Sequence, residues 1–573
     1  MTTVGDAIWK MLADAGVKRC YGIIGDALNP VVDALRRDGR VEFVHVRNEE
    51  AGTFAAVGEA LVTGGPVAVC GTAGPGVVHL LNGLLDAARE GAPVIAIAGD
   101  TASALIDSGT IEEVNPYALF APASLYTGRI LHPAQTRTVV QTALRTAIID
   151  NGPTVISVPG DIAAQKVEHD AHQPVSYRPA VLRPSDEDLG ELASLIDAAG
   201  SVTIFGGDGC RFAHDEVVAL AAKLAAPVGY AYRGKQWLEW GNPNAVGMSG
   251  LLGWGGAYEA MHRCDLCLLL GTSFPFADFY PSRPIKVQID RRGTMLGRRT
   301  HVDMALVGDV HDTVAALLPL VAAKDDGDHL THAVRVTEKW RTRMAHYVTR
   351  GPKLKRIRPE YLVSTLDELA DDDAAFTVDT GTACIWAARY VTAKAGRNII
   401  GSLSWASMAN AMPNALGIAL SCPGRQAIAL CGDGGIAMML GELLTIAARQ
   451  IPVKIVVLNN SSLDFVHIEM EEAGIQPFGT ELVNPNFAAL AESIGITGTR
   501  LDAPADVRDV VRDFLAAPGP ALLDAVVDPH ALSLPPHITF GMAEGFALSM
   551  AKQAIHGSLD EVIDTAGDNV LLA

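Results

Sequence analysis

The fold is most clearly indicated by two segments, Gln426-Ala-Ile-Ala-Leu-Cys-Gly-Asp-Gly-Gly435 and Val453-Lys-Ile-Val-Val-Leu-Asn-Asn460. Each segment is an apolar run that ends in polar residues or glycines, and the interval between them suits one strand–helix–strand crossover. In a doubly wound sheet both strands end at the same carboxyl edge, where ligands bind. We therefore expect a strand, a Gly-Asp-Gly turn, a helix from Gly435 and a second strand that ends at Asn460.

The residues at these strand ends are typical of a site for Mg²⁺ and phosphate. Asp433 offers a carboxylate and Asn460 a carboxamide, and Mg²⁺ prefers hard oxygen ligands together with phosphate oxygens. Gly432, Gly434 and Gly435 let backbone amides approach a phosphate, and a helix N-terminus adds a favourable dipole. A lone Gly-Asp-Gly is common turn chemistry, so the prediction depends on the whole strand–turn–helix–strand pattern.

The same alternation of apolar runs and helical stretches extends over the rest of the chain. Near-continuous apolar strands are typical of parallel sheets covered by helices on both faces. The predicted strands include Val67–Cys70, Pro93–Ala98, Thr154–Val158, Ser201–Phe205, Asp265–Leu270, Ile285–Ile289, Phe376–Asp379 and Ala521–Val527. The pattern is interrupted at about 165–184 and 322–359. We predict an α/β protein with three doubly wound parallel-sheet domains at 1–180, 181–340 and 355–530, and a C-terminal tail at 531–573.

Composition excludes several classes of protein. The 573 residues carry 45 Lys and Arg against 65 Asp and Glu, a net charge of −20, which argues against a nucleic-acid partner. A hydrophobic fraction of 49% excludes a disordered chain. No apolar run approaches the roughly 20 residues of a membrane span, and the N-terminus lacks a secretory pattern, so we expect a cytoplasmic location. Cys264 and Cys267 form a C-x-x-C spacing without partners for a zinc site, and we expect them to be buried core thiols.

Beyond these patterns, the chain resembles a known family. It is similar to the pyruvate oxidase and acetolactate synthase group of thiamine diphosphate enzymes, and most similar to the bacterial pyruvate:quinone oxidoreductases. The resemblance covers nearly the whole chain and is carried, besides the Gly-Asp-Gly segment, by ordered motifs such as Gly22-Ile-Ile-Gly-Asp26, Arg47-Asn-Glu-Glu50, Gly74-Pro-Gly76, Gly247-Met-Ser-Gly250 and Ser407-Met-Ala-Asn-Ala-Met-Pro413.

The resemblance implies roles for individual residues. Asp433, Asn460 and the backbone carbonyl of Ser462 match the magnesium ligands. Glu49 matches the glutamate that hydrogen-bonds the pyrimidine ring of the cofactor and so promotes loss of a proton from its thiazolium ring. Met408 matches the apolar residue that holds the cofactor in its bent form. In the family the glutamate and the diphosphate site come from different subunits, which implies a dimer as the smallest catalytic unit and a tetramer as the expected assembly.

The middle of the chain is similar to the FAD domain of pyruvate oxidases. Glycines and polar residues lie next to predicted strands there, as expected where backbone approaches a dinucleotide, although each cluster alone is also typical of a plain turn. The implied FAD residues are Gly206, Arg233, Gly234, Lys235, Gly247, Met248, Gly250, Gly271, Thr272, Asp290 and Asp309. Phe465 matches an aromatic residue that lies between the two cofactors in quinone-linked members, which implies a part in electron relay.

Several positions on the substrate side depart from the family pattern. The usual Phe-Gln-Glu is Ile111-Glu-Glu113, the usual His-Gly-Ser-Met is Trp405-Ala-Ser-Met408, and the usual Leu-Gly-Phe is Leu463-Asp464-Phe465. A second carboxylate, Glu112, would repel an anionic 2-oxo acid unless it is protonated or turned away. We therefore hypothesise a substrate or acceptor other than pyruvate and quinone, with the cofactor chemistry kept.

The C-terminal tail bears on membrane attachment. Leu559, Val562, Ile563 and Ala566 form a helical apolar stripe, and quinone-linked members dock on the membrane through such a segment. Residues 543–573 carry five acids and one lysine, which anionic lipid would repel. Peripheral docking at the inner membrane face is therefore an alternative that the sequence does not favour.

Three functions follow from the sequence. The first is oxidative decarboxylation of a 2-oxo acid, with pyruvate the leading candidate, using thiamine diphosphate, Mg²⁺ and FAD and passing electrons to quinone or another acceptor. The second keeps the decarboxylation but joins the acyl group to a carbonyl acceptor, with FAD structural. A non-catalytic binding protein is disfavoured because Glu49, Asp433 and Asn460 are all present.

Overall fold

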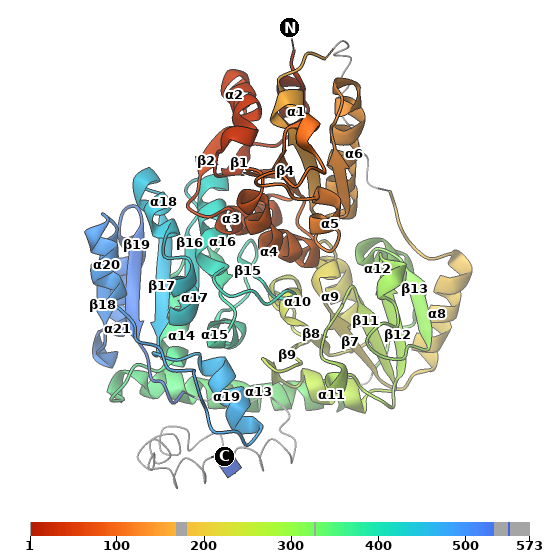
Figure 1. The fold of residues 1–573 in the computed structure, drawn as a ribbon. Helices are drawn as coiled ribbons and strands as arrows, with labels where there is room; N and C mark the ends of the chain where they lie inside the picture. Colours follow the sequence, from red (N-terminus) through yellow and green to blue (C-terminus); the bar gives the residue numbers. More distant parts are fainter. Residues whose placement is uncertain (1, 168–179, 326–327, 532–547, 550–573) are drawn as a thin grey trace.

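Near-continuous apolar runs form the central strands of three sheets in the computed structural model, which describes residues 2–167, 180–325, 328–531 and 548–549. Every residue of β3 (Val67–Gly71), β4 (Val94–Asp100) and β17 (Val453–Asn459) is buried, because helices cover both faces of each sheet. Figure 1 shows the three α/β domains in chain order, from red through green to blue. The predicted fold class is confirmed.

The N-terminal sheet is entirely parallel, in the order β2-β1-β3-β4-β6-β5. Its other strands are β1 (Arg19–Gly22), β2 (Glu42–His45), β5 (Tyr126–Arg129) and β6 (Thr154–Pro159). The helices around it are α1 (Val4–Asp14), α2 (Asn29–Asp38), α3 (Glu49–Thr63), α4 (Pro75–Glu90), α5 (Pro116–Phe120), α6 (Thr136–Asp150) and α7 (Gly160–Ala163).

The central sheet has the order β10-β9-β8-β7-β11-β12-β13, and β10 pairs with β9 in antiparallel fashion while the other pairs are parallel. Its strands are β7 (Val202–Gly206), β8 (Val228–Tyr230), β9 (Ala245–Met248), β10 (Trp254–Gly255), β11 (Leu266–Leu270), β12 (Ile285–Asp290) and β13 (Met304–Val307). Its helices are α8 (Asp186–Ala198), α9 (His214–Lys223), α10 (Tyr232–Leu238), α11 (Ala257–Arg263) and α12 (Val310–Leu317).

The C-terminal sheet is again parallel, in the order β15-β14-β16-β17-β19-β18. Its other strands are β14 (Ala375–Val378), β15 (Asn398–Gly401), β16 (Ala427–Gly432), β18 (Thr497–Leu501) and β19 (Ala521–Val526). Its helices are α14 (Pro359–Leu369), α15 (Thr382–Tyr390), α16 (Ala411–Ser421), α17 (Asp433–Met438), α18 (Glu442–Arg449), α19 (Asp464–Glu472), α20 (Phe487–Ser493) and α21 (Val507–Ala516).

The N-terminal and C-terminal domains dock through α3 and α16. A Cβ atom on Gly58 would lie 2.4 Å from the carbonyl oxygen of Asn414, and one on Gly417 would lie 1.9 Å from that of Ala55. Both positions need glycine because the two helix backbones approach so closely. The apolar side chains of this interface, including Phe54, belong to one core that continues into both sheets.

The interval at 322–359, which interrupts the sequence pattern, contains the long helix α13 (Asp328–Arg350). The helix contacts α11 of the central domain and α14 of the C-terminal domain, and Figure 1 shows it lying along both. The predicted domain end at residue 340 falls inside it. The sequence pattern did not indicate this helix because its sequence is highly charged and only a few of its residues are buried, among them Ala333, Thr337 and Tyr347.

Two further predictions concern the cysteines and the tail. Cys264 and Cys267 are both buried and unbridged, so the expectation of core thiols is confirmed. The apolar stripe from Leu559 to Ala566 lies outside the described residues. Among residues 2–167, 180–325, 328–531 and 548–549, we find no helix with the length and hydropathy of a membrane span.

Candidate functional site

The carboxylate of Asp433 lies at the carboxyl edge of the C-terminal sheet, where β16 passes into α17. It is 2% exposed. Its Oδ1 accepts the N–H of Gly434 at 2.8 Å, and its Oδ2 accepts the N–H of Ser461 at 2.6 Å and Nδ2 of Asn484 at 2.8 Å. Burial raises the pKa of Asp433, and a divalent cation at the site would oppose that shift by favouring the charged form.

The loop after β17 brings Asn460 to the same edge. Asn460 Oδ1 accepts the N–H of Ser462 at 3.1 Å, and Ser461 between them has a φ of 59°, which turns the chain sharply. The hydrogen bond from Ser461 to Asp433 therefore places the two predicted magnesium-ligand segments side by side. Ser462 forms an isolated bridge with Glu481.

Asn484 is a residue of this site that the sequence pattern did not suggest. Its Nδ2 donates to Asp433 Oδ2 and, at 3.0 Å, to Oδ1 of Asn459. Asn459 in turn donates to the fully buried Asp524 at 2.9 Å, which also accepts from Arg500 at 2.6 Å. This chain of hydrogen bonds fixes the orientation of the Asp433 carboxylate. Asn484 lies in a loop far along the chain, so only the three-dimensional structure reveals it.

The neighbouring strand β14 supplies a second set of groups. Asp379 is buried, its Oδ1 accepts the N–H of Asn410 at 3.2 Å, and its Oδ2 has no hydrogen-bond partner among the described residues. Burial raises the pKa of Asp379 to about 7. A Cβ on Gly435 would lie 1.8 Å from Asp379 Oδ2, whereas Cβ atoms on Gly432 or Gly381 would meet nothing within 4 Å. Glycine is thus required at 435 for packing, while Gly432 and Gly381 leave their backbone open.

These observations test whether the site suits Mg²⁺ and a diphosphate. It offers a buried carboxylate and a carboxamide as oxygen ligands, two open glycines at adjacent strand ends, and the N-terminus of α17. It also holds the unpartnered Asp379 Oδ2. The donor set fits: Asp433, Asn460 and the Ser462 carbonyl would hold the ion, and the backbone near Gly432 and Gly434 would hold phosphate oxygens.

The loop 402–410 lies against this edge. Ala406 and Ala409 have φ values of 62° and 66°, so the loop is held in a backbone conformation that alanine rarely adopts. The terminal methyl of Met408 lies 3.4 Å from the place of a Cβ on Gly434. The predicted wedge residue thus projects toward the Gly-Asp-Gly turn. Thr380 Oγ1 donates to the carbonyl oxygen of Ser407 at 2.8 Å and joins the loop to β14.

Glu49 is the first residue of α3 and is 4% exposed. Its Oε2 lies 3.0 Å from Nδ1 of His79 on α4, and its Oε1 lies 3.2 Å from the place of a Cβ on Gly76. Its neighbour Glu50 accepts Asn82 Nδ2 at 2.7 Å. Glu49 therefore contacts His79, whereas Glu50 binds Asn82, and Glu49 is the more buried of the two.

A pocket next to this region is lined by Glu112, one of the departures from the family pattern. Its lining includes Gly74, Asp100, Glu112, Val114 and Phe120. Glu112 is exposed and has a φ of 63°, and its Cα and Cβ lie 2.9 Å from the place of a Cβ on Gly74. Because Glu112 remains in contact with water, its charge needs no buried counter-ion.

The glycines of the central domain have a packing role. A Cβ on Gly234 would lie 2.6 Å from the carbonyl oxygen of Gly206, and one on Gly247 would lie 2.4 Å from that of Trp254. Gly271, with a φ of 52°, would meet the backbone of Gly209 at 2.5 Å. These close approaches explain the glycines without a ligand. A Cβ on Gly250 would lie 2.9 Å from the ring of Phe274.

The charged residues predicted for FAD are engaged inside the protein. Lys235 is buried, forms an ion pair with Glu239, and lies 5.7 Å from the ring centre of Trp254. Arg233 binds Glu90 of the N-terminal domain at 3.0 Å and Asp208 at 2.9 Å. These contacts direct the Lys235 ammonium and the Arg233 guanidinium toward other protein groups and not toward a ligand site.

Other groups at the carboxyl edge of the central sheet do suit a ligand. The strand order reverses between β7 and β11, which makes this a switch point of the kind where ligands bind. Gly206 ends β7, Gly271 and Thr272 follow β11, and Thr272 is buried. Ser249 Oγ, one residue after Met248, and Trp254 Nε1 are buried and lack hydrogen-bond partners in the part of the chain that the structure describes. Because such groups are seldom left unpaired, a polar ligand here would satisfy them.

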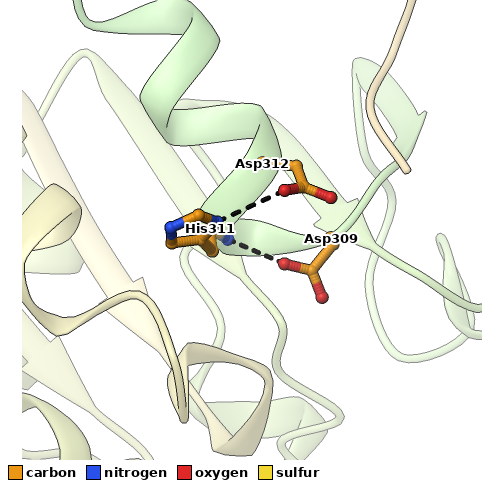
Figure 2. A group of neighbouring side chains, drawn as sticks. All are labelled: Asp309, His311 and Asp312. Carbon is orange, nitrogen blue, oxygen red and sulfur yellow. Dashed lines mark hydrogen bonds and ion pairs between the residues drawn. The ribbon is translucent and has the colours of Figure 1, made fainter. Parts of the chain in front are cut away.

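Asp290 is the last residue of β12, and Asp309 comes two residues after β13. Asp290 is buried at the end of β12, and burial raises its pKa. Asp309 caps α12 by accepting the N–H of His311 at 3.0 Å, and Figure 2 shows it beside His311 and Asp312. These three side chains have metal-ligand chemistry, but each already has a protein partner: His311 lies 3.3 Å from Asp312, and Asp312 accepts the N–H of Leu182 at 2.9 Å.

Phe465 lies half-buried on α19, next to Asp464. Asp464 replaces the usual glycine of the family pattern, and burial raises its pKa to about 7. The helix begins two residues after Ser462, so Phe465 is carried close to the magnesium-ligand loop. Its expected part in electron relay stays a prediction.

Comparison with known proteins agrees with this geometry. Three family profiles match in order: the N-terminal thiamine pyrophosphate binding domain at residues 2–119, the central domain of these enzymes at 189–317, and the C-terminal thiamine pyrophosphate binding domain at 379–525. The Bacillus subtilis protein YdaP, described as thiamine pyrophosphate-containing, is 34% identical over 557 residues, with 96% of each chain covered.

Two relatives have named activities. The pyruvate oxidase of Lactiplantibacillus plantarum is 29% identical over 536 residues, which are 91% of this chain and 88% of that protein. The large subunit of acetolactate synthase isozyme 1 of Escherichia coli is 27% identical over 542 residues, which are 92% of this chain and 94% of that protein. The chain belongs to the thiamine pyrophosphate enzyme family, and its activity is of the 2-oxo acid decarboxylation type.

Proposed function

We propose that the protein oxidatively decarboxylates a 2-oxo acid, with pyruvate the first candidate, and passes the electrons through FAD to quinone or another acceptor. The observation that carries the proposal is the buried Asp433 carboxylate beside Asn460, at a strand edge where Gly432 and Gly381 leave the backbone open. The overall reaction consumes one water and one 2-oxo acid and releases CO₂, a carboxylic acid, two electrons and two protons.

Each residue has a limited task in this scheme. When bound, thiamine diphosphate supplies the nucleophilic carbon and accepts the electron pair that CO₂ leaves behind. Asp433, Asn460 and the Ser462 carbonyl would hold the metal ion and, through it, the diphosphate. Glu49 would accept and return a proton at the pyrimidine ring nitrogen. Met408, which lies against Gly434, would support the bent form of the cofactor.

FAD binding is supported by the carboxyl edge of the central sheet. The β7/β11 switch point and the unpartnered Ser249 Oγ and Trp254 Nε1 offer a place for a polar dinucleotide. Thr272 and Asp290 lie at the same edge: Thr272 follows β11, and Asp290 is the last residue of β12. Arg233 and Lys235 are engaged elsewhere, so we assign the nucleotide to this edge without them.

The second candidate is a carboligase in which FAD is structural, favoured by the similarity to acetolactate synthase. Anaerobic addition of pyruvate to the holoenzyme with thiamine diphosphate and Mg²⁺ separates the two. Bleaching of the flavin absorbance with acetate formation supports the oxidase, and a carboligation product without bleaching supports the second candidate. Absence of both reactions would refute pyruvate as substrate, and a panel of longer 2-oxo acids would then be compared in the same assay.

The departures Ile111, Glu112 and Trp405 favour a substrate or acceptor other than pyruvate and quinone. Glu112 lines the pocket beside Gly74 and is exposed, and a carboxylate there would weaken binding of a small anion more than that of an uncharged compound. Glu112→Gln is expected to lower the KM for pyruvate. Unchanged pyruvate kinetics in this variant would contradict the hypothesis that Glu112 selects against pyruvate.

We further propose a homodimer as the catalytic unit, assembled further into a tetramer. Apolar side chains are exposed on loops at both cofactor edges: Ile111 is 86% exposed in the N-terminal domain and Phe478 87% in the C-terminal domain. A partner chain would cover them, with the N-terminal edge of one chain facing the C-terminal edge of the other.

Complementation tests the shared site. At a Mg²⁺ concentration that only just saturates the wild type, Glu49→Gln and Asp433→Asn are each expected to have little activity, but their mixed dimer would contain one intact site. Equal mixing with subunit exchange should then restore about one quarter of the wild-type activity. If each site lay within one chain, mixing would restore none.

A further inference from the structure

A row of polar side chains on α4 holds the loop 402–410. The row, which we call the α4 stripe, lies on one face of the helix at intervals of four residues and consists of Asn82, Asp86 and Glu90. Asn82 Oδ1 accepts Nε1 of Trp405 at 2.7 Å, and its Nδ2 donates to Ser407 Oγ at 3.0 Å. Asp86 accepts the hydroxyl of Ser402 at 2.7 Å.

Glu90 completes the stripe and brings in the central domain. Its Oε1 accepts the N–H of Ser404 at 2.6 Å, and its Oε2 lies 3.0 Å from Nε of Arg233. The Arg233 guanidinium also donates to the carbonyl oxygens of Glu90 at 2.8 Å and Arg89 at 3.3 Å, to Ser404 Oγ at 3.3 Å and to Asp208 at 2.9 Å. Arg233 therefore joins α4, the loop and its own domain at one point.

The charges make this junction depend on Arg233. The carboxylates of Asp86 and Glu90 are both buried. Burial raises the pKa of Asp86 to about 8 and raises that of Glu90, and the positive charge of Arg233 opposes both shifts. Without the guanidinium, the buried Glu90 carboxylate would lose its ion-pair partner, and removing one member of a buried ion pair strongly destabilises local structure.

The loop transmits this junction to the cofactor edge. Ser402 Oγ accepts the N–H of Ser407 at 2.8 Å, and the Ser407 carbonyl oxygen accepts Thr380 Oγ1. Met408 follows directly and lies against Gly434. A displacement of Glu90 or Ser404 would therefore be passed along the loop backbone and these hydrogen bonds to the residues around the diphosphate site.

We propose that Arg233 is a positioning residue: through Glu90 and Ser404 it holds the loop 402–410 on the α4 stripe, and so sets the place of Trp405 and Met408 at the thiamine diphosphate site. This inference rests on the proposed function only where the test measures kcat and KM. Binding of the cofactor can be measured without any substrate, so a failure of the substrate assignment would leave the inference intact.

The test compares Arg233→Met with Arg211→Met in the full-length protein. Arg211 is a matched control because it also reaches from the central to the N-terminal domain, donating to the carbonyl oxygen of Leu61 at 2.9 Å, without touching the loop. The readouts are the thiamine diphosphate Kd, from the ligand-induced rise in unfolding temperature, the flavin content, and kcat and KM.

We expect Arg233→Met to weaken thiamine diphosphate binding by about 10-fold to 100-fold, with flavin content kept and kcat lowered. Arg233→Lys, which keeps one charge toward Glu90, should lie between this variant and wild type, and serves if Arg233→Met does not fold. Combining Arg233→Met with Glu90→Gln should lose less than the sum of the two single changes.

Two results would overturn the inference. One is loss of flavin with unchanged thiamine diphosphate affinity, because Arg233 would then act on the nucleotide. The other is an equal loss in the Arg233 and Arg211 variants, because any contact between these domains would then have the same effect.

Discussion

Replacing Gly417 by alanine should force apart the two helices that join the N-terminal and C-terminal domains. The new Cβ would lie 1.9 Å from the carbonyl oxygen of Ala55 and 2.7 Å from its carbonyl carbon. Since Cβ atoms do not approach other atoms closer than 3.0 Å, α3 and α16 must separate by about 1 Å. The obstruction is backbone, which cannot rotate away as a flexible side chain would.

Two opposing effects decide the magnitude. Alanine is favoured over glycine inside a helix by about 1 kcal/mol. Overpacking a dense interior costs about 1–3 kcal/mol, and separating the helices also opens gaps around Phe54 in the shared core. We expect the steric effect to dominate, with a net loss of about 2 kcal/mol of unfolding free energy.

Thermal unfolding followed by circular dichroism, with and without thiamine diphosphate and Mg²⁺, measures the effect. The matched control is Gly190→Ala on α8, where a Cβ would meet nothing within 4 Å, so this variant should be unchanged or stabilised by up to about 1 kcal/mol. Because α3 begins with Glu49, Gly417→Ala should also weaken the response to cofactor. Wild-type stability and cofactor affinity in Gly417→Ala would refute the reasoning.

Three further outcomes are expected. Asp433→Asn should raise the Mg²⁺ concentration needed for half-maximal cofactor binding by about 10-fold to 100-fold, measured by titration at fixed thiamine diphosphate. Glu49→Gln should keep cofactor affinity but lower kcat by about 100-fold or more, because its proton exchange is lost. Asp86→Asn should remove a pH dependence of stability: burial raises the pKa of Asp86 to about 8 in the folded protein, so the unfolded chain releases that proton first, and wild-type stability falls as pH rises from about 4 to about 8.

Each has its own control and its own contrary result. The control for Glu49→Gln is Glu50→Gln, which alters a carboxylate that binds Asn82 instead of His79 and should keep most of the activity. An equal loss of kcat in both variants would show that Glu49 has no role of its own in proton exchange. An unshifted Mg²⁺ titration in Asp433→Asn would place the ion elsewhere. For Asp86→Asn, whose neighbours include Glu90 and Arg233, an unfolding temperature parallel to wild type at every pH would show that Asp86 does not retain its proton.

The sequence was sufficient to predict the sheets, and to predict that Asp433 and Asn460 lie at one sheet edge. Apolar runs such as β16 and β17 are local signals, and the polar residues that follow them, Asp433 and Asn460, meet because parallel strands share a carboxyl edge. The helix after β16 starts at Asp433, two residues before the predicted start, which is the usual uncertainty at a helix end.

What the sequence concealed depends on contacts between distant segments. Asn484 supports Asp433 from a loop with no motif of its own, and Asp379 acquires its raised pKa only through burial. Arg233 lies in a motif that resembles a nucleotide site, yet its guanidinium is occupied by Glu90, some 140 residues earlier in the chain. Side-chain direction at such positions is set by tertiary packing, which spacing along the chain does not encode.

The strand orders of the N-terminal and C-terminal sheets carry a further consequence. Counted within each domain, both run 2-1-3-4-6-5, and α3 and α16 are the same element of that plan, each following the second strand and preceding the third. Their reciprocal glycines, Gly58 and Gly417, therefore make an interface of the self-complementary kind seen between identical subunits. The N-terminal and C-terminal domains are therefore two copies of one plan joined in a single chain, with the residues predicted to bind the metal on one copy and the predicted glutamate on the other.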